Sequence, residues 1–409
     1  MMGGHGVPEN VSAPEPFVVP QGLKTACYAL IALGVIGLVV GLLTDPMATQ
    51  IGWLSGFWLT TAFALLSAFF VAVGYASYAM WNVTLRRIPE AMMGWLPIGA
   101  VTGAITVGFA FLEHSIFHHW THPEGPHAAV VLKKGWWLNT NRFVIFYVIT
   151  MALLLYLVAK LRRHSYTQDQ DGDVEHSWKL QSLGPVFLII FSLGFSGLAV
   201  DFLMSLQPSW FSTMWGVYIF AGAWQATNAM ICLTAVLLVE RGYLDKVWVN
   251  ENHIHDVAKF MFAFTVFYGY IAFCQFLLIW YANLPEETIF YHDRYLNGWA
   301  IWTWVLVFGK FIIPFAVLLR HGIKRMGYGL KAACVWVVCA QIFELWWLVA
   351  PAAKVGSAHP GPGIPFVEIS IMLGFFGAFI LVSARALSKH SLIPVKDPRL
   401  HEVIAHHQI

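Results

Sequence analysis

The sequence has few charged residues, and this scarcity excludes most soluble folds. Aspartate, glutamate, lysine and arginine make up only 11% of the 409 residues, whereas apolar and aromatic residues make up 58%. An average soluble domain is about a quarter charged, and disordered chains are poor in apolar residues. The formal charge of +2 gives no indication of a nucleic-acid partner. The composition therefore favours a protein that crosses a membrane several times.

Grouped metal ligands are missing as well. The five cysteines lie inside apolar runs, and no two of them are spaced as CxxC. Zinc sites and iron–sulfur clusters need grouped thiolates. No histidine lies in the central part of an apolar run, where a haem held inside the membrane would need its axial ligands. We therefore expect no metal and no cofactor in this chain.

Ten apolar runs are long enough to cross a bilayer, since a spanning helix needs about 20 mostly apolar residues. They lie near residues 24–43, 57–80, 93–113, 142–161, 183–203, 213–239, 257–283, 299–320, 328–350 and 364–386. Residues 1–23 form an N-terminal segment and residues 387–409 a tail. The sequence predicts an all-α polytopic membrane protein with one transmembrane domain over residues 24–386.

The distribution of lysine and arginine predicts the orientation, because these residues are enriched in cytoplasmic loops. Sixteen of the 24 lie in the N-terminal flank, the even-numbered loops and the tail. The odd-numbered loops carry only five, namely Lys133, Lys134, Arg142, Arg294 and Lys354. Both termini are therefore expected in the cytoplasm. The inner loop 162–182 holds four acidic residues and is expected to be a solvated turn.

Ionisable residues inside the apolar runs are the first candidates for function, because a charge at bilayer depth is costly unless it is paired or hydrated. Lys310 lies in the middle of the eighth run, roughly 15 Å from either end at about 1.5 Å per residue. Glu344 and Glu368 lie closer to the outer ends of the ninth and tenth runs and are expected to share one layer. Gln341 precedes Glu344 by three positions, which places both on one helical face.

Two interpretations of these residues remain open. Together with Gln225 and Asn228 of the sixth run, they could form a hydrated track for protons, in which neighbouring carboxylates raise each other's pKa. Alternatively, Lys310 and a glutamate form a structural ion pair, and the amides form hydrogen bonds between helices. Loss of proton coupling in an intact assembly would favour the track, whereas loss of assembly would favour the structural pair.

Other polar residues lie at the ends of runs. Asp201 and Glu113 lie at outer ends, and Asp256 lies at the inner start of the seventh run; each could exchange protons or be a solvated helix end. The outer loop after the third run carries a histidine cluster, His114, His118, His119, His122 and His127. Pro123 interrupts this segment, so we expect an exposed loop or a subunit contact rather than a metal site.

The segment between residues 194 and 222 reads GFSGLAVDFLMSLQPSWFSTMWGVYIFAG. One apolar run ends near Asp201, a short outer turn follows, and the next run begins at once. This segment resembles the hallmark of the ActF subunits of bacterial alternative complex III, a quinol:cytochrome c or quinol:electron-acceptor oxidoreductase. Ten spans, a histidine-bearing outer loop after the third span and cytoplasmic termini extend the resemblance over most of the chain.

The resemblance implies a fold and a set of partners. ActF subunits are similar to membrane subunits of the NrfD and polysulfide-reductase type, which implies two four-helix bundles, spans 2–5 and 6–9, flanked by spans 1 and 10. It also implies the bacterial inner membrane, a related ActC-like sister subunit, an iron–sulfur subunit, multihaem and monohaem cytochrome c subunits and small membrane subunits. A terminal oxidase is a further candidate partner, and lipids surround the chain. Haem c and iron–sulfur clusters would lie in those partners, with quinol as substrate.

Three functions follow as hypotheses. The first is a cofactor-free subunit of a quinol-oxidising respiratory complex that conducts protons or has a structural role and does not catalyse the reaction alone. The second is an NrfD-type subunit that itself binds quinone, with Glu113 and His114 as the nearest candidates together with Asp201. The third is a stand-alone secondary transporter, which is less favoured because the two halves lack matching spans interrupted by glycine or proline.

Overall fold

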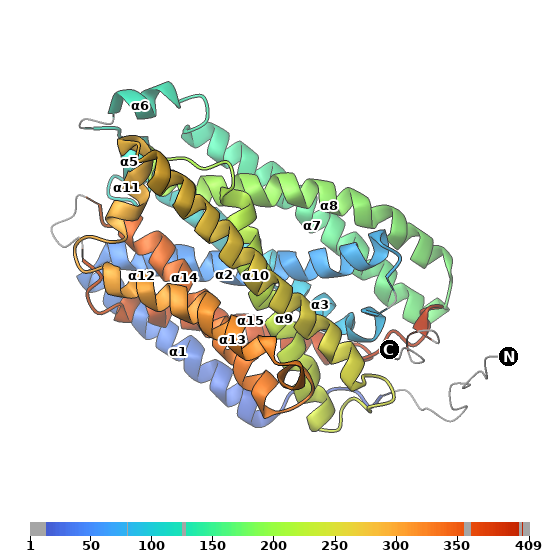
Figure 1. Ribbon diagram of the computed structural model, residues 1–409. Coiled ribbons are helices and arrows are strands. Elements are labelled where there is room, and N and C mark those ends of the chain that lie inside the picture. Colours follow the sequence, from blue (N-terminus) through green and yellow to red (C-terminus); the bar gives the residue numbers. More distant parts are fainter. Residues whose placement is uncertain (1–13, 80, 125–127, 356–360, 401–402, 404–409) are drawn as a thin grey trace.

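The computed structural model describes residues 14–79, 81–124, 128–355, 361–400 and 403. Every regular element in these ranges is helical, and ten helical segments are long and apolar enough to cross a membrane. Backbone groups in a bilayer must be hydrogen-bonded within the protein, and a helix achieves this within one segment. The expected all-α polytopic membrane protein is therefore confirmed (Figure 1).

The ten spans differ in regularity. Seven are uninterrupted α-helices: α1 (Gln21–Thr44), α2 (Pro46–Ala76), α7 (Thr140–Asp171), α9 (Trp215–Glu240), α10 (Glu251–Ala282), α14 (Tyr328–Ala353) and α15 (Phe366–Leu387). The fifth joins α8 (Glu175–Phe202) to η4 (Met204–Leu206). The third consists of η1 (Val83–Leu85), α3 (Arg87–Met92), η2 (Met93–Trp95), α4 (Leu96–Gly108) and η3 (Phe109–Phe111). The eighth consists of α12 (Ala300–Leu306), the π-helix η5 (Val307–Ile312) and α13 (Ile313–Leu319). The connections hold α5 (His118–Thr121), α6 (Ala128–Lys133), α11 (Pro285–Asp293) and η6 (His321–Lys324).

The spans pack as two groups of four, which agrees with the arrangement that the resemblance implies. In the first bundle, α2 packs against α4 and α8, and α7 packs against α8 and α4. In the second bundle, α9 packs against α10 and α14, and the eighth span contacts both α10 and α14. Helix α1 lies along α15, and α15 lies along α2 (Figure 1). These two are the flanking helices.

Helix α2 lies at the centre of the molecule, where it contacts both bundles and the flanking helix α15. In its most apolar stretch 89% of the residues are buried, against 83% for α9 and 72% for α14. The same share is only 22% for α1 and for the eighth span, which turn most of their apolar surface outwards. The interface between the bundles is thus the best-covered part of the protein, built mainly from α2, α9 and α14.

The flanking helices approach each other through glycine. A Cβ atom added to Gly34 of α1 would lie 2.5 Å from the Cα of Gly374 in α15. Small residues let two helix backbones come this close, and such contacts are a main source of helix association in membranes. The pairing of α1 with α15 therefore depends on glycine at both positions.

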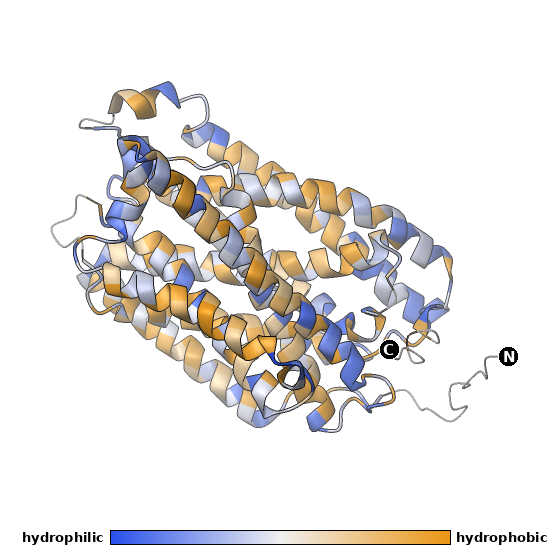
Figure 2. Cartoon of the chain, in the orientation of Figure 1, coloured by the Kyte–Doolittle hydropathy of each residue, from blue (hydrophilic) through white to orange (hydrophobic). Residues whose placement is uncertain are grey.

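Hydrophilic residues gather toward the two ends of the helices, with apolar residues between them (Figure 2). We call the end that carries residues 77–79, 81–82, 172–174, 241–250, 320–327 and 388–400 the tail face, and the opposite end the far face. The segment before α1 reaches the tail face, where Tyr243 donates a hydrogen bond to the carbonyl of Val18. Asp397 of the tail is bonded to Arg86 at the same face. The described residues before the first span and those after the last span therefore both lie at the tail face.

Several boundaries differ from the sequence prediction. Helix α2 begins eleven residues before the predicted start of 57, because Asp45 caps its N-terminus and Pro46 occupies the first turn. The third span begins at Val83 rather than near 93. The predicted loop 162–182 is mostly helical, since α7 continues to Asp171 and α8 starts at Glu175. Helices therefore extend beyond the apolar runs, on the far face in α2 and on the tail face in the third span, α7 and α8.

Candidate functional site in the second bundle

Lys310 lies in the middle of the eighth span and is fully buried. Its ammonium nitrogen Nζ is 3.3 Å from Oε2 of Glu344 and donates to the carbonyl of Gly222 at 3.2 Å. It also donates to Oε1 of Gln341. An ammonium group has three N–H donors and no acceptor; Nζ donates to Gly222 and Gln341, and the carboxylate of Glu344 balances its charge. The charge is held by one carboxylate and two neutral acceptors from α9 and α14.

Glu344 joins this lysine to two phenols. Its Oε1 accepts a hydrogen bond of 2.9 Å from the hydroxyl of Tyr218, which lies 3.2 Å from the hydroxyl of Tyr268. The two tyrosine rings are stacked with centroids 5.4 Å apart, and Nζ of Lys310 lies 5.4 Å from the centre of the Tyr268 ring. Helices α9, α10, η5 and α14 thus all contribute to one buried polar network, which we call the Lys310 network: Lys310, Glu344, Gln341, Tyr218 and Tyr268.

The backbone at Lys310 is a π-helix, Val307–Ile312. Short π-helical segments inside spans are rare and often occur at functional sites. Pro314 explains part of this one, because proline has no N–H to donate to the carbonyl four residues earlier, that of Lys310. Trp336 of α14 donates to the carbonyl of Gly309 at 2.8 Å. Apart from Pro314, nothing in the sequence indicated this irregular turn.

Gln225 and Asn228 lie in the same bundle and are fully buried, as the sequence predicts for a central polar step. Nε2 of Gln225 donates to Oγ1 of Thr265 in α10 at 2.7 Å, and Nδ2 of Asn228 donates to the carbonyl of Trp224 at 2.8 Å. The amide oxygens of both side chains have no partner among the described residues. They are separate polar groups beside the Lys310 network rather than links in a continuous chain of hydrogen bonds.

The carboxylate of Glu368 is bonded outside the Lys310 network. Its Oε1 accepts from Nζ of Lys354 at 3.1 Å, near the far face. Glu344 is paired with Lys310 instead. The sequence predicts a layer in which two carboxylates influence each other, whereas the structure gives each carboxylate its own lysine. The reason is tertiary: Glu344 lies inside α14, whereas Lys354 directly follows the last residue of α14 and reaches Glu368 of α15.

The remaining predicted residues lie at the ends of spans. Asp201 is buried at the far-face end of α8. The two terminal guanidinium nitrogens of Arg142 donate to its carboxylate at 2.9 and 2.6 Å, and the indole nitrogen of Trp137 donates at 3.1 Å. Glu113 and His114 are exposed on the far face. Asp256 pairs with Lys259 at 3.0 Å near the tail face. None of these four predicted residues belongs to the Lys310 network.

The histidine cluster lies on the far face. The rings of His118 and His122 are stacked at 5.2 Å, and Nδ1 of His118 is 2.9 Å from the carbonyl of Glu113. Burial lowers the pKa of His119, and electrostatic repulsion from the neighbouring His118 lowers it further. Within the described residues no group of three or more histidine, cysteine or acidic side chains could hold a metal ion. His127 lies outside the described residues.

A large groove opens beside the Lys310 network, between α10 and the eighth span. Its volume is about 850 Å³, and its walls are mostly aromatic and aliphatic. Tyr218 and Tyr268 line it, and Arg294 and Asp293 lie near its far-face end. Burial raises the pKa of Asp293 and lowers that of Arg294 to about 9. Gln207 bridges these two, since its Nε2 donates to Asp293 at 2.6 Å and its Oε1 accepts from Arg294 at 2.8 Å.

Sequence reasoning missed a second buried cluster, at the tail-face end of the first bundle. Arg86 and Arg87 are two of the sixteen basic residues that the sequence assigns to loops and flanks. Both side chains are only 2% exposed in the structure, and Glu90 is 1% exposed. Nε of Arg86 lies 3.1 Å from Glu90, and Arg87 pairs with both Glu90 and Asp169. The Arg-Arg-x-x-Glu spacing, which places opposite charges on one helical face, was the available signal.

Neither a protein-family model nor any curated protein sequence matches this chain. The class of protein is therefore defined by the fold and the buried network alone: an all-α polytopic membrane protein with an ion pair in the interior of one bundle.

Proposed function

We propose that this chain is a membrane subunit of a respiratory quinol:electron-acceptor oxidoreductase of the alternative complex III type and that the Lys310 network relays protons. The observation that carries the proton relay is the contact between Lys310 and Glu344 at 3.3 Å, with both side chains buried. The assignment to a respiratory complex rests on the resemblance of residues 194–222 to ActF subunits. The arrangement in two four-helix bundles is in agreement with it.

The chemistry of the relay follows from burial. Desolvation penalises the two charges of the pair, while their mutual attraction favours them, so the charged and neutral forms differ less in free energy than in water. Transfer of one proton from Nζ of Lys310 to Oε2 of Glu344 converts the charged pair to the neutral pair. Tyr218 and Gln341 hold the two partners in place for this transfer.

In this proposal the chain holds no redox cofactor of its own. Electrons pass from quinol through the iron–sulfur and cytochrome c subunits, and the ActC-like sister subunit lies beside this chain in the bacterial inner membrane. Co-purification tests this part directly. A tagged chain extracted in mild detergent should bring down haem c and iron–sulfur subunits, and a solitary chain or homo-oligomer would contradict the respiratory assignment.

The relay is tested in the purified assembly reconstituted in liposomes. Glu344→Gln keeps the shape of the side chain but removes its charge, and we expect at least a tenfold loss of proton transfer while the complex stays assembled. Lys331→Met is the matched control, because Lys331 forms an exposed pair with Glu240 in the same bundle. Normal proton transfer by assembled Glu344→Gln would show that the pair is structural.

The groove favours a second candidate function, the binding of quinone by this chain. An apolar groove of about 850 Å³ that ends at two phenols offers space for a hydrophobic molecule with a polar head. It lies apart from Glu113 and His114, the candidates from sequence. Ala272→Trp should block the groove and abolish labelling by a photoreactive quinone, whereas Leu193→Trp on the exposed surface of α8 should not. Unchanged labelling in Ala272→Trp would exclude the groove.

A further inference from the structure

A small cavity lies between the two bundles, next to Glu344. It is lined by α2 on one side and by α9 and α14 on the other, and every lining residue is buried. The volume of the cavity that a water-sized sphere can occupy is about 10 Å³. This is roughly the room that one water molecule needs. The cavity is therefore an interior space at the best-covered interface of the protein.

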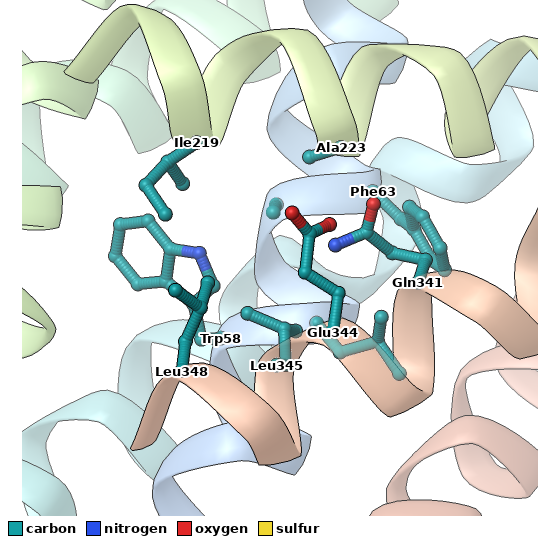
Figure 3. Close-up of a pocket in the computed structure, with 10 residues that line it drawn as sticks. Trp58, Phe63, Ile219, Ala223, Gln341, Glu344, Leu345 and Leu348 are labelled. Carbon is teal, nitrogen blue, oxygen red and sulfur yellow. The ribbon is translucent and has the colours of Figure 1, made fainter. Parts of the chain in front are cut away.

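Three polar groups converge on this cavity. Figure 3 shows the indole nitrogen of Trp58, the carboxylate of Glu344 and the amide of Gln341 turned toward the same space. Nε1 of Trp58 and Oε2 of Glu344 are both buried without a hydrogen-bond partner among the described residues. Oε2 is close to the charge of Lys310, but a carboxylate oxygen can accept more than one hydrogen bond.

The orientation of Gln341 follows from its other neighbour. Lys310 can only donate, so Gln341 must present its carbonyl oxygen to Nζ. The amide NH₂ group of Gln341 is then left for the opposite side, which is the cavity. The cavity thus has two N–H donors, from Trp58 and Gln341, and one acceptor, Oε2 of Glu344.

We propose that this cavity is a binding site for one water molecule that links the two bundles. The water accepts from the N–H groups of Trp58 and Gln341 and donates to Oε2 of Glu344. A cation is disfavoured by the two inward N–H groups and by the nearby ammonium of Lys310, and an anion is disfavoured by the carboxylate. A single water molecule donates and accepts hydrogen bonds without adding charge, and it fits the volume of the cavity.

The site goes beyond the proposed function, because a static ion pair would bind this water equally well. Its consequence is structural and chemical. It links α2 to α14 by hydrogen bonds across the interface, and it gives Glu344 a neighbouring water molecule that can exchange protons. Sequence reasoning assigned no role to Trp58.

The test is a structure of the purified assembly at a resolution that shows ordered waters, for the unaltered chain and for two variants. We expect density for one water within hydrogen-bond distance of Trp58, Gln341 and Glu344. Ala223→Val should fill the cavity and remove this density, because Ala223 lines it. Trp346→Phe is the matched control: its indole N–H is also buried and unpartnered, but it does not line the cavity, so the density should persist.

A direct contact between the Trp58 indole and Glu344, with no density between them, would overturn the proposal. Vibrational spectroscopy in water labelled with oxygen-18 gives a second measurement, which does not depend on resolving density for the water. A water band that shifts on labelling and disappears in Trp58→Phe is expected, and its persistence in Trp58→Phe would also overturn the site. Density for the water together with normal proton transfer in Glu344→Gln would reject the relay while keeping the site.

Discussion

The two bundles keep their buried charges at different depths. In the first bundle the ion pairs lie at the ends of the spans, Arg87 with Glu90 at the tail face and Arg142 with Asp201 at the far face. Aromatic rings fill part of the interior between them, including those of Phe69 and Phe191, whose centroids are 5.1 Å apart. In the second bundle Lys310 and Glu344 meet midway along the eighth span.

This difference separates charges for which a structural role suffices from charges that are candidates for function. A pair at the end of a span lies close to water and to long side chains that can reach it, and its position needs no special role. A pair in the middle must be desolvated, and ionisable groups at that depth are usually functional. The second bundle also has the π-helix and the groove, whereas the first has uninterrupted helices at the corresponding depth in α2, α7 and α8.

The largest expected effect is that of Lys310→Met, which leaves the buried carboxylate of Glu344 without its cation. Removing one member of a buried pair costs about 3–5 kcal/mol. We expect a marked loss of thermal stability in detergent and loss of proton transfer. The double variant Lys310→Met/Glu344→Leu should regain much of the stability but not the transfer. Recovery of both would make the two bundles alike, with structural pairs only.

The corresponding change in the first bundle is Glu90→Gln, which removes the carboxylate between two buried guanidinium groups. The same physical cost gives a destabilisation of about 3 kcal/mol. Proton transfer per assembled complex should stay normal, because this cluster lies at the end of the bundle. A loss of transfer in complexes that remain assembled would show that the first bundle also carries protons.

Glycine substitutions sharpen the comparison with smaller effects. A Cβ atom at Gly222 would lie 2.8 Å from Oε2 of Glu344, and one at Gly184 would lie 2.8 Å from the carbonyl oxygen of Ala72 in the first bundle. Both Gly222→Ala and Gly184→Ala should cost about 1–3 kcal/mol through overpacking. Only Gly222→Ala should also slow proton transfer, as measured in liposomes. Equal transfer in the two variants would count against a precise geometry at Glu344.

The most local effect concerns pH and the C-terminal tail, whose Asp397 pairs with Arg86 of the first bundle. Burial opposes ionisation of Asp397, but Arg86 and Arg399 outweigh it and lower its pKa to about 2. Because the folded pKa is below that of the unfolded chain, the stabilisation is present above about pH 4. It is lost as the pH falls toward 2 and amounts to roughly 2 kcal/mol.

Limited proteolysis after exposure to acid should show earlier release of the tail than of the spans. Asp397→Asn should release the tail already at neutral pH, since the neutral side chain no longer pairs with Arg86. Release of the tail should leave the rate of proton transfer through the second bundle unchanged. Cleavage of the tail at the same rate at pH 3 and pH 7 would contradict this assignment.

The sequence predicted the number of spans because each apolar run is an independent length of about 20 residues. It placed the ends of these runs less well, since Asp45 and the polar ends of α7 and α8 extend helices past the apolar stretch. Lys310, Glu344 and Gln341 were found because a charge at mid-span is visible in a one-dimensional pattern. Tyr218 is an ordinary aromatic residue in such a pattern, and only its contacts distinguish it.

The sequence by itself therefore determined how residues are distributed across the thickness of the membrane: ten spans, both flanks on the same side and one lysine at mid-depth. What only the tertiary structure decided is lateral: that Glu344 rather than Glu368 pairs with Lys310, that Arg86, Arg87 and Glu90 are buried, and that Trp58 faces Glu344 across the bundle interface. The physical reason is that hydropathy fixes the depth of a residue in a membrane. Which helix lies beside which depends on close packing of backbones and side chains.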